Sequence, residues 1–133
     1  MDRAIKILLD YDLMIIPINV TATDHWVLTF MDFVKKITVV YDSYELNDQQ
    51  PAHPEMHLHL LAWLMREHQV WRIPFDAQDW TAVRGQRTPQ QGTRGHPGLD
   101  CGVFILAFAM YLSINHPLEF GQTDMPALRN WIA

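Results

Sequence analysis

Residues 99–112 read LDCGVFILAFAMYL and contain the only cysteine of the 133-residue chain. A glycine-rich stretch precedes this almost wholly apolar run, and the sequence Asn-His-Pro follows shortly after it at residues 115–117. An apolar run of this length between two such breaks predicts a helix, and a helix that is apolar on all sides is expected to be buried. Cys101 would then lie at the N-terminus of a buried helix.

A cysteine in that position has a chemical consequence. The unpaired N–H groups of a helix N-terminus and the positive end of the helix dipole favour an anion there. A thiolate is such an anion, and it is the nucleophilic form of cysteine. The alternative is that Cys101 is one more small buried residue, which is where free cysteines usually lie. The partners that the rest of the chain supplies decide between the two.

Length and composition limit the class of protein. A chain of 133 residues that is 49% hydrophobic can build the core of one domain. The net charge of −5 with only ten Lys and Arg residues argues against a nucleic-acid backbone as the main ligand. A single cysteine permits no internal disulfide, and neither a signal peptide nor a bilayer-spanning apolar run is evident. We therefore expect an intracellular protein of the nucleus or cytoplasm that binds no membrane.

The two ends of the sequence suggest how much of a domain is present. The chain opens within a short helical pattern at residues 4–9, and the apolar face of its last helical pattern continues to Ala133. That last helix is expected to begin at Asp124, with Pro126 in its first turn. We expect residues 1–133 to form a single domain that is truncated at both ends.

Three runs in the first third of the chain predict strands. Residues 13–19 form an apolar run too short for a globular helix, with a proline near its end. Residues 26–32 and 37–41 are rich in β-formers and are separated by a short break that ends in two lysines. The last two runs are expected to pair as an antiparallel hairpin.

The hairpin brings a histidine and an aspartate together. If the turn is centred between Phe33 and Val34, His25 lies directly opposite Asp42, with Cβ atoms about 4.5–5.5 Å apart. A carboxylate there would accept a hydrogen bond from one imidazole nitrogen and leave the other nitrogen free as a base. The alternative is a solvated His25 and a turn-capping Asp42 at the strand ends.

An amphipathic helix is predicted over residues 54–68, and residues 69–75 (QVWRIPF) predict another short strand. His53 and His57 have the i, i+4 spacing that can chelate a metal, but no third ligand and no HExxH arrangement is evident. A polar helix face is the better interpretation, and we expect no metal site.

Two adjacent glutamines lie in the glycine-rich stretch upstream of Cys101. This stretch lacks the GxxxxGK[ST] pattern of a phosphate-binding loop. The side-chain amide of Gln90 or Gln91, beside the backbone N–H of the cysteine, would stabilise the oxyanion that forms when a thiolate attacks an acyl carbon. The alternative is that both are ordinary polar residues of a loop.

Four short motifs follow one another in a fixed order, namely His25-Trp26, Tyr41-Asp42-Ser43, Pro89-Gln90-Gln91 and Asp100-Cys101-Gly102. No single motif is decisive, but in this combination and order the chain resembles the ubiquitin-like-protein-specific cysteine proteases. These are the SUMO-deconjugating, or sentrin-specific, proteases. The likeness runs over nearly the whole chain, from IPIN before the histidine to HPLEFGQTDMP near the end.

The resemblance implies a fold and a set of roles. The fold is α+β, of the papain-like cysteine protease superfamily, with a small and mainly antiparallel sheet packed on a buried helix that begins at the catalytic cysteine. Cys101 matches the nucleophile, His25 the general base, Asp42 the residue that orients the base, and Gln91 the oxyanion donor. Trp26 matches the aromatic residue that covers the narrow Gly-Gly tail of the substrate. No metal or cofactor is implied.

The implied reaction is cleavage after the C-terminal Gly-Gly of a ubiquitin-like modifier of the SUMO type, or of its conjugates, through a thioester. Two alternatives stay open: a non-catalytic binding module (a pseudoprotease), and a related acetyltransferase. The sequence departs from the family pattern in two ways. It begins after an upstream portion that carries another tryptophan of the tail-binding channel, and residues 92–97 lengthen the link between Gln91 and Asp100. That insertion leaves open which glutamine serves the oxyanion.

Overall fold

The computed structural model describes residues 11–22, 24–44, 53–86 and 100–133. The helical pattern expected at residues 4–9 lies outside the described residues, as do Gln90 and Gln91.

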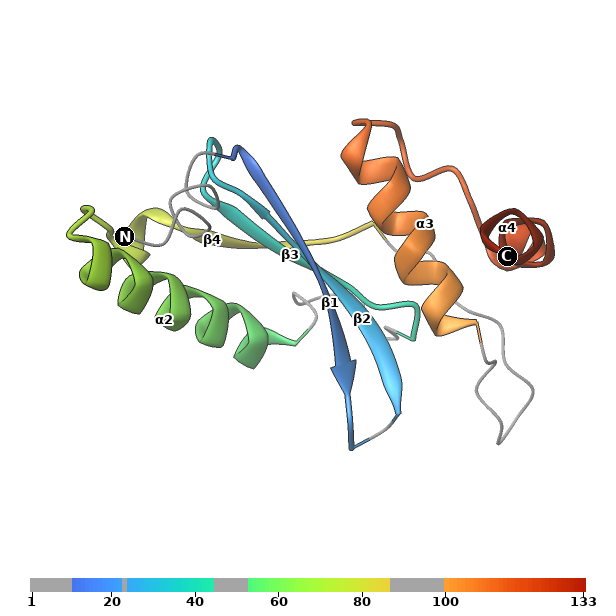
Figure 1. Cartoon of the computed structure of the whole chain (residues 1–133), viewed down its shortest axis with the longest axis horizontal. Helices are drawn as coiled ribbons and strands as arrows, with labels where there is room; N and C mark the ends of the chain where they lie inside the picture. The colour runs from blue at the N-terminus through green and yellow to red at the C-terminus, as the bar shows by residue number, and fades with distance from the viewer. Residues whose placement is uncertain (1–10, 23, 45–52, 87–99) are drawn as a thin grey trace.

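A four-stranded mixed sheet forms the centre of the described structure (Figure 1). Its spatial order follows the chain, β1 (Leu13–Val20), β2 (His25–Asp32), β3 (Ile37–Tyr41) and β4 (Thr81–Arg84). The first three strands pair antiparallel, and β4 pairs parallel to β3. The expected hairpin and the expected strand before it are therefore confirmed. Pro17 is tolerated within β1 because β1 is an edge strand.

The register of the hairpin differs from the predicted one. The pairs Leu28↔Tyr41 and Asp32↔Ile37 place the turn centre between Val34 and Lys35, one residue later than expected. The side chain of Asp32 sets this turn, because its Oδ1 accepts hydrogen bonds from the N–H groups of Val34 at 3.0 Å and Lys35 at 2.8 Å. Each residue of β2 consequently faces a residue of β3 two positions further along than predicted.

Two long helices cover opposite faces of the sheet, as Figure 1 shows. Helix α2 (Pro54–Trp71) lies on one side, and α3 (Cys101–Ser113) lies on the other. The short 3-10 segments η1 (Ala77–Asp79) and η2 (Gln122–Asp124) precede β4 and α4 (Met125–Ile132), respectively. Helix α4 packs beside α3 and begins where the sequence predicts, with Asp124 as N-cap residue.

The alternation of side chains along β2 and β3 explains how one sheet serves both helices. Leu28, Val39 and Tyr41 join the main core cluster with the buried residues of α3. Val27 and Val40 point to the other face and pack with Met56 of α2. Both faces of the central hairpin are thus buried, which fixes its register because a one-residue slip would exchange the two faces.

Two predictions about the helices are corrected. Residues 69–71 continue α2 instead of forming a strand, and Arg72 closes the helix in the left-handed conformation with φ 55°. The buried face that carries Leu64 and His68 extends this helix past the point where local β-propensity favours a strand. Helix α3 is not buried all round, because Leu106 is 48% exposed.

Candidate active site

His25 and Asp42 meet in the structure. The Nε2 atom of His25 lies 2.6 Å from Oδ1 of Asp42, and both side chains are almost completely buried. The hydrogen bond forms although the register is shifted, since a shift of two residues keeps both side chains on the same face of the sheet. Tyr44 lies in the turn that follows β3, and its ring stacks on that of His25 with centroids 4.1 Å apart.

The Asp42 carboxylate accepts two further hydrogen bonds. The backbone N–H of Tyr44 donates to Oδ1 at 2.7 Å, and Nε2 of His53 lies 2.7 Å from Oδ2. Burial alone would raise the pKa of Asp42, but these hydrogen bonds and the one from His25 hold that pKa far below its usual range. Asp42 is therefore an anion at every physiological pH.

The ionised carboxylate fixes the tautomer of His25. A carboxylate has no proton to donate, so Nε2 of His25 carries the proton of the hydrogen bond. In the neutral ring the other nitrogen, Nδ1, then holds a lone pair. Nδ1 is buried, and no hydrogen-bond partner is found for it among the described residues. A buried imidazole with one nitrogen held by a carboxylate and the other unpaired has the arrangement of a general base.

Cys101 is the first residue of α3, as the sequence predicts. Its neighbour Asp100 is the N-cap residue, but its carboxylate does not cap the helix. Instead it accepts hydrogen bonds from Nε2 of Gln122, at 2.7 Å, and from the Arg129 guanidinium. The hydrogen bond from Arg129 is the main reason that the pKa of Asp100 lies below its usual value, and burial opposes this effect. These contacts fasten the start of α3 to η2 and α4.

Trp26 points to the face opposite His25 and lies against the start of α3. It lines a hollow of about 550 Å³ together with Pro17, Gly102, Val103 and Leu106, and with residues of α4. Trp26 is 38% exposed, and the walls of the hollow are mostly apolar. Because Trp26 follows His25 and Gly102 follows Cys101, the starts of β2 and α3 meet at this hollow.

The structure thus joins some of the predicted site residues and leaves others apart. His25 and Asp42 are hydrogen-bonded, and Trp26 shares a hollow with the residue after Cys101. No hydrogen bond between Cys101 and His25 is found within the described part of the chain. Gln91, the expected oxyanion donor, lies outside the described residues.

The two histidines with metal-ligand spacing bind different groups. His53 faces Asp42, whereas Nδ1 of His57 lies 2.6 Å from Oγ1 of Thr38 in the sheet. His57 is 3% exposed, so this bond fastens α2 to β3 inside the protein. In the ranges that the structure describes, no three His, Cys, Asp or Glu side chains form a metal-binding group.

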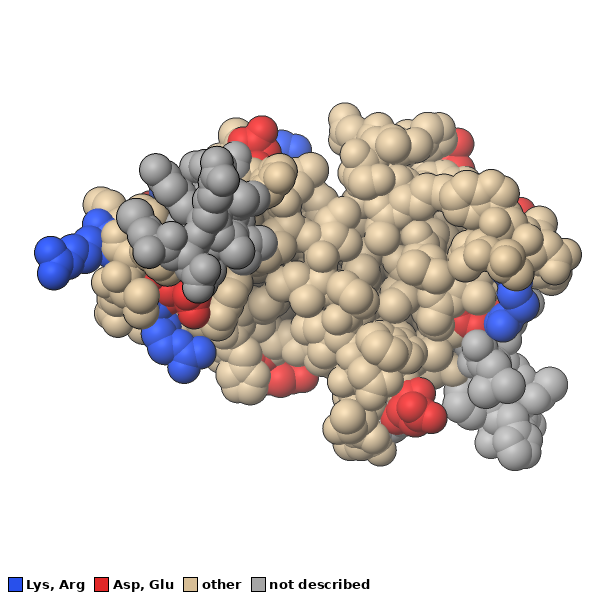
Figure 2. All heavy atoms as spheres, viewed as in Figure 1, with Lys and Arg blue, Asp and Glu red and all other residues tan. Residues whose placement is uncertain are grey.

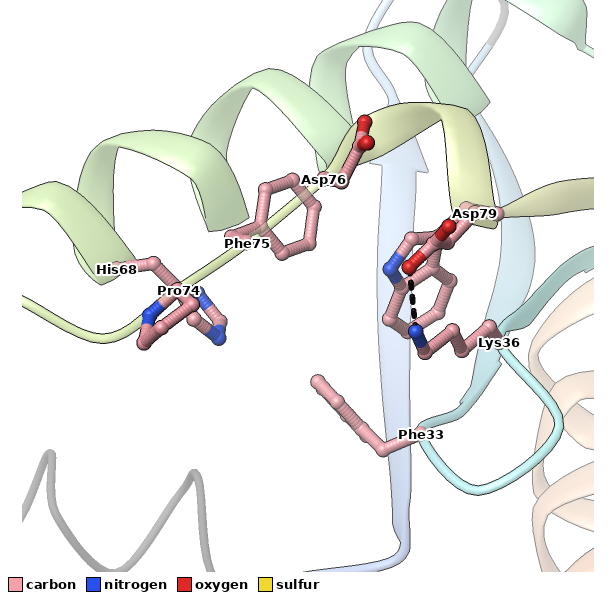
Figure 3. Close-up of a pocket in the computed structure, with 8 residues that line it drawn as sticks. Phe33, Lys36, His68, Pro74, Phe75, Asp76 and Asp79 are labelled. Carbon is pink, nitrogen blue, oxygen red and sulfur yellow. Dashed lines mark hydrogen bonds and ion pairs between the residues drawn. The ribbon is translucent and has the colours of Figure 1, made fainter.

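A second hollow, of about 410 Å³, lies at the other end of the hairpin (Figure 3). Phe33, Phe75 and Trp80 line it, and an ion pair of 2.5 Å between Lys36 and Asp79 lies beside them. Phe33 follows the last residue of β2, whereas His25 is its first, so the length of an eight-residue strand, about 25 Å, separates this hollow from His25. It is therefore not part of the candidate active site.

Two features of the structure concern nucleic acids and membranes as possible partners, namely the placement of the basic side chains and the character of the helices. On the face shown in Figure 2, the Lys and Arg side chains of the described residues form small separate groups and do not gather into one patch. None of the described helices has both the length and the apolar character that crossing a membrane requires.

Sequence reasoning did not assign His53 or Tyr44 to this site. Tyr44 becomes visible only in the structure, where its ring stacks on that of His25. The sequence distinguishes His53 by its spacing from His57, but the signal that matters is its position immediately before Pro54 at the start of α2. That position places its side chain beside the end of β3, where Asp42 lies.

The chain is similar to known proteins over most of its length. The family described as "Ulp1 protease family, C-terminal catalytic domain" matches residues 2–133. Sentrin-specific protease 2 of Rattus norvegicus is 32% identical over 125 residues, which are 92% of this chain and 19% of that protein.

Solved structures give the same result. A structure of the SUMO protease Ulp1 with its catalytic cysteine oxidised to a sulfenic acid matches with a TM-score of 0.71 and 26% identity, over 91% of this chain and 50% of that one. A second, of the C-terminal Ulp1 protease domain in complex with Smt3, the yeast orthologue of SUMO, shares the fold with a TM-score of 0.67 at 24% identity, over 92% of this chain. The chain spans about half of these solved chains and less than a fifth of the curated relative.

Proposed function

Because this chain belongs to the Ulp1 protease family, we propose that it is a cysteine protease that cleaves after the C-terminal Gly-Gly of a SUMO-type modifier. The observation that carries the proposal is the buried His25–Asp42 hydrogen bond, which leaves Nδ1 of His25 as the available base. A histidine bound to a carboxylate and a cysteine at a helix N-terminus are the groups that acyl transfer by a cysteine protease uses.

The proposed reaction begins with proton transfer. Nδ1 of His25 takes the proton of the Cys101 thiol, and the imidazolium that forms is stabilised by Asp42, which stays ionised. The helix N-terminus at Cys101 favours the resulting thiolate.

The thiolate then attacks the carbonyl carbon of the last glycine. A C–S bond forms, and the carbonyl π electrons move to the oxygen. The backbone N–H of Cys101, together with a side-chain amide from Gln91 or Gln90, is proposed to bind this oxyanion. When the oxyanion collapses, the C–N bond breaks and the amine leaves with the proton from His25. A water molecule, deprotonated by His25, then hydrolyses the thioester and restores the thiol.

Trp26 and its hollow support the choice of a Gly-Gly tail. The apolar hollow beside Gly102 gives an extended tail a place to lie next to Cys101, with the indole of Trp26 as one wall. A narrow channel selects glycine because larger side chains are excluded from it.

The experiment is hydrolysis of a fluorogenic amide placed after the C-terminal Gly-Gly of SUMO. Wild-type protein should release the fluorophore, and the Cys101→Ala variant should not. Equal release by that variant would refute the proposal. SUMO binding without hydrolysis would also refute it and would identify a non-catalytic binding module, the candidate that the missing hydrogen bond between Cys101 and His25 favours.

A further inference from the structure

The Asp42 carboxylate lies between two imidazole rings, and only one of them has a role in the proposed reaction. His25 binds Oδ1 and His53 binds Oδ2, at 2.6 Å and 2.7 Å. Asp42 is 9% exposed, so both bonds form where water competes poorly with them. A change in the charge of His53 therefore changes the electrostatic potential at the carboxylate that binds His25.

The backbone holds His53 in this position. His53 is the N-cap residue of α2 and has a left-handed conformation, φ 48°, which non-glycine residues adopt rarely. The helix begins directly behind it, with the Met56 N–H donating to its carbonyl oxygen at 2.9 Å. The ring of His53 is thus placed by the start of the helix.

We propose that His53 is a positioning residue of the same site, which holds Asp42 through its second oxygen and, when protonated, offsets part of the negative charge that acts on His25. This inference rests on the proposed function only for its enzymatic consequence. The electrostatic coupling of the two histidines can be measured with no substrate present.

The charged and titratable neighbours favour the cationic form of His53. From the sheet side it faces Asp42 and, beyond it, His25 with the Tyr44 ring stacked on it. From α2 it faces Glu55, whose Oε1 lies 3.4 Å from Nδ1 of His53. The next histidine of that helix, His57, is bonded to Thr38. The hydrogen bond to Asp42 raises the pKa of His53, burial opposes this, and the nearby carboxylate charges add to the rise.

The sign of the effect of His53 follows from the repulsion between two like charges. A cation at His53 disfavours a second cation at His25, because both rings bind the same carboxylate. Because His25 must be neutral to act as the proposed base, a cationic His53 extends activity toward lower pH.

The test is a titration of the His25 ring resonances by NMR in wild-type protein and in His53→Gln, which keeps a hydrogen-bond donor but cannot become cationic. The variant should raise the measured pKa of His25 by about 1–2 units, as expected when one positive charge on the same carboxylate is removed at an effective dielectric constant of about 20. The acidic limb of kcat/KM should move up by a similar amount. The matched control is His59→Gln, an exposed histidine of the same helix, which should leave both values unchanged.

A second measurement needs no variant. In wild-type protein the His25 resonances should show an additional inflection at the pH where His53 titrates. A His25 pKa that is the same in folded His53→Gln as in wild type, or a His25 curve with no inflection at the His53 pKa, would overturn this inference. Either result would leave the proposed protease activity untouched, and failure of that activity would not alter the NMR titration.

Discussion

His25 and Asp42 are hydrogen-bonded at 2.6 Å although they are not directly opposite each other in the hairpin. The Tyr44 ring stacks on the imidazole of His25 with centroids 4.1 Å apart. Asp42 directly follows the last residue of β3 and reaches Nε2 of His25 from there. Asp42 therefore binds one nitrogen of His25, and the other nitrogen, Nδ1, has no hydrogen-bond partner among the described residues.

Replacing Asp42 with asparagine should reduce catalysis far more than binding. The amide carries no charge to stabilise the His25 imidazolium, and its NH₂ group would face a donor of Tyr44 or His53. We expect kcat/KM on a fluorogenic SUMO amide to fall by about 10²–10⁴-fold, mainly through kcat. Asp79→Asn, in the distant hollow, is the matched control and should keep wild-type kinetics. A loss carried by KM alone would contradict the role given to Asp42.

The Asp42–His53 pair should stabilise the fold within a limited pH range. The pKa of Asp42 is lowered on folding, so its contribution is present above about pH 4 and is lost as the pH falls further. The pKa of His53 is raised on folding, so its contribution is full below about pH 6.5 and is lost as the pH rises through the folded value. The free energy of unfolding lost in His53→Gln should therefore be largest between about pH 4 and 6.5. Urea unfolding at several pH values measures this, and a loss as large at pH 8.5 as at pH 5.5 would be the opposite of the expected result.

Gly85, which follows β4, should not accept a larger residue. A Cβ atom there would lie 2.8 Å from Cδ1 of Tyr41 and 3.1 Å from Cγ1 of Val39. The Tyr41 ring cannot move freely, because it packs against Phe108 with centroids 5.0 Å apart. Gly85→Ala should lower the free energy of unfolding by about 1–3 kcal/mol.

Gly121→Ala is the control for Gly85→Ala, because a Cβ atom at Gly121 meets nothing within 4 Å. It should change the stability by less than about 0.5 kcal/mol. Equal midpoints of thermal unfolding for the two variants would show that the stability of the protein does not depend on the close approach of Gly85 to Tyr41.

The buried bond between Thr38 and His57 should matter for stability and not for chemistry. Thr38→Val keeps the shape of the side chain but removes the hydroxyl that lies 2.6 Å from Nδ1 of His57. We expect a loss of about 1–3 kcal/mol in the free energy of unfolding. Thr81→Val, at an exposed position of β4, should be close to neutral. A neutral Thr38→Val would indicate that this bond does not fasten α2 to the sheet.

Local patterns predicted the elements on which the site is built. Alternation and β-propensity predicted β2 and β3, and the apolar run after Asp100 predicted the start of α3 at Cys101. That His25 and Asp42 lie on the same face was also predictable. Side chains alternate between the two faces along a strand, so a shift of two residues leaves the face unchanged. Their roles as base and orienting acid remain proposals.

Features that depend on distant contacts were not predicted. The register depends on the Asp32 carboxylate, which moves the turn by one residue. Strand β4 has only four residues and gains its place by parallel pairing with β3. The helix over residues 69–71 is stabilised by a buried face that local propensity does not reveal. His53 reaches Asp42 only because α2 begins beside the end of β3.

The most direct test of the central claim is covalent capture of Cys101. A SUMO probe ending in Gly-Gly vinyl sulfone is incubated with the protein, and the adduct is located by peptide mass spectrometry, with a sentrin-specific protease as positive control. Wild-type protein should form one adduct, on Cys101, His25→Gln should form it at least about 10²-fold more slowly, and Cys101→Ser should form none. Equal labelling of Cys101→Ser, or no adduct on Cys101 while the positive control reacts, would contradict the account.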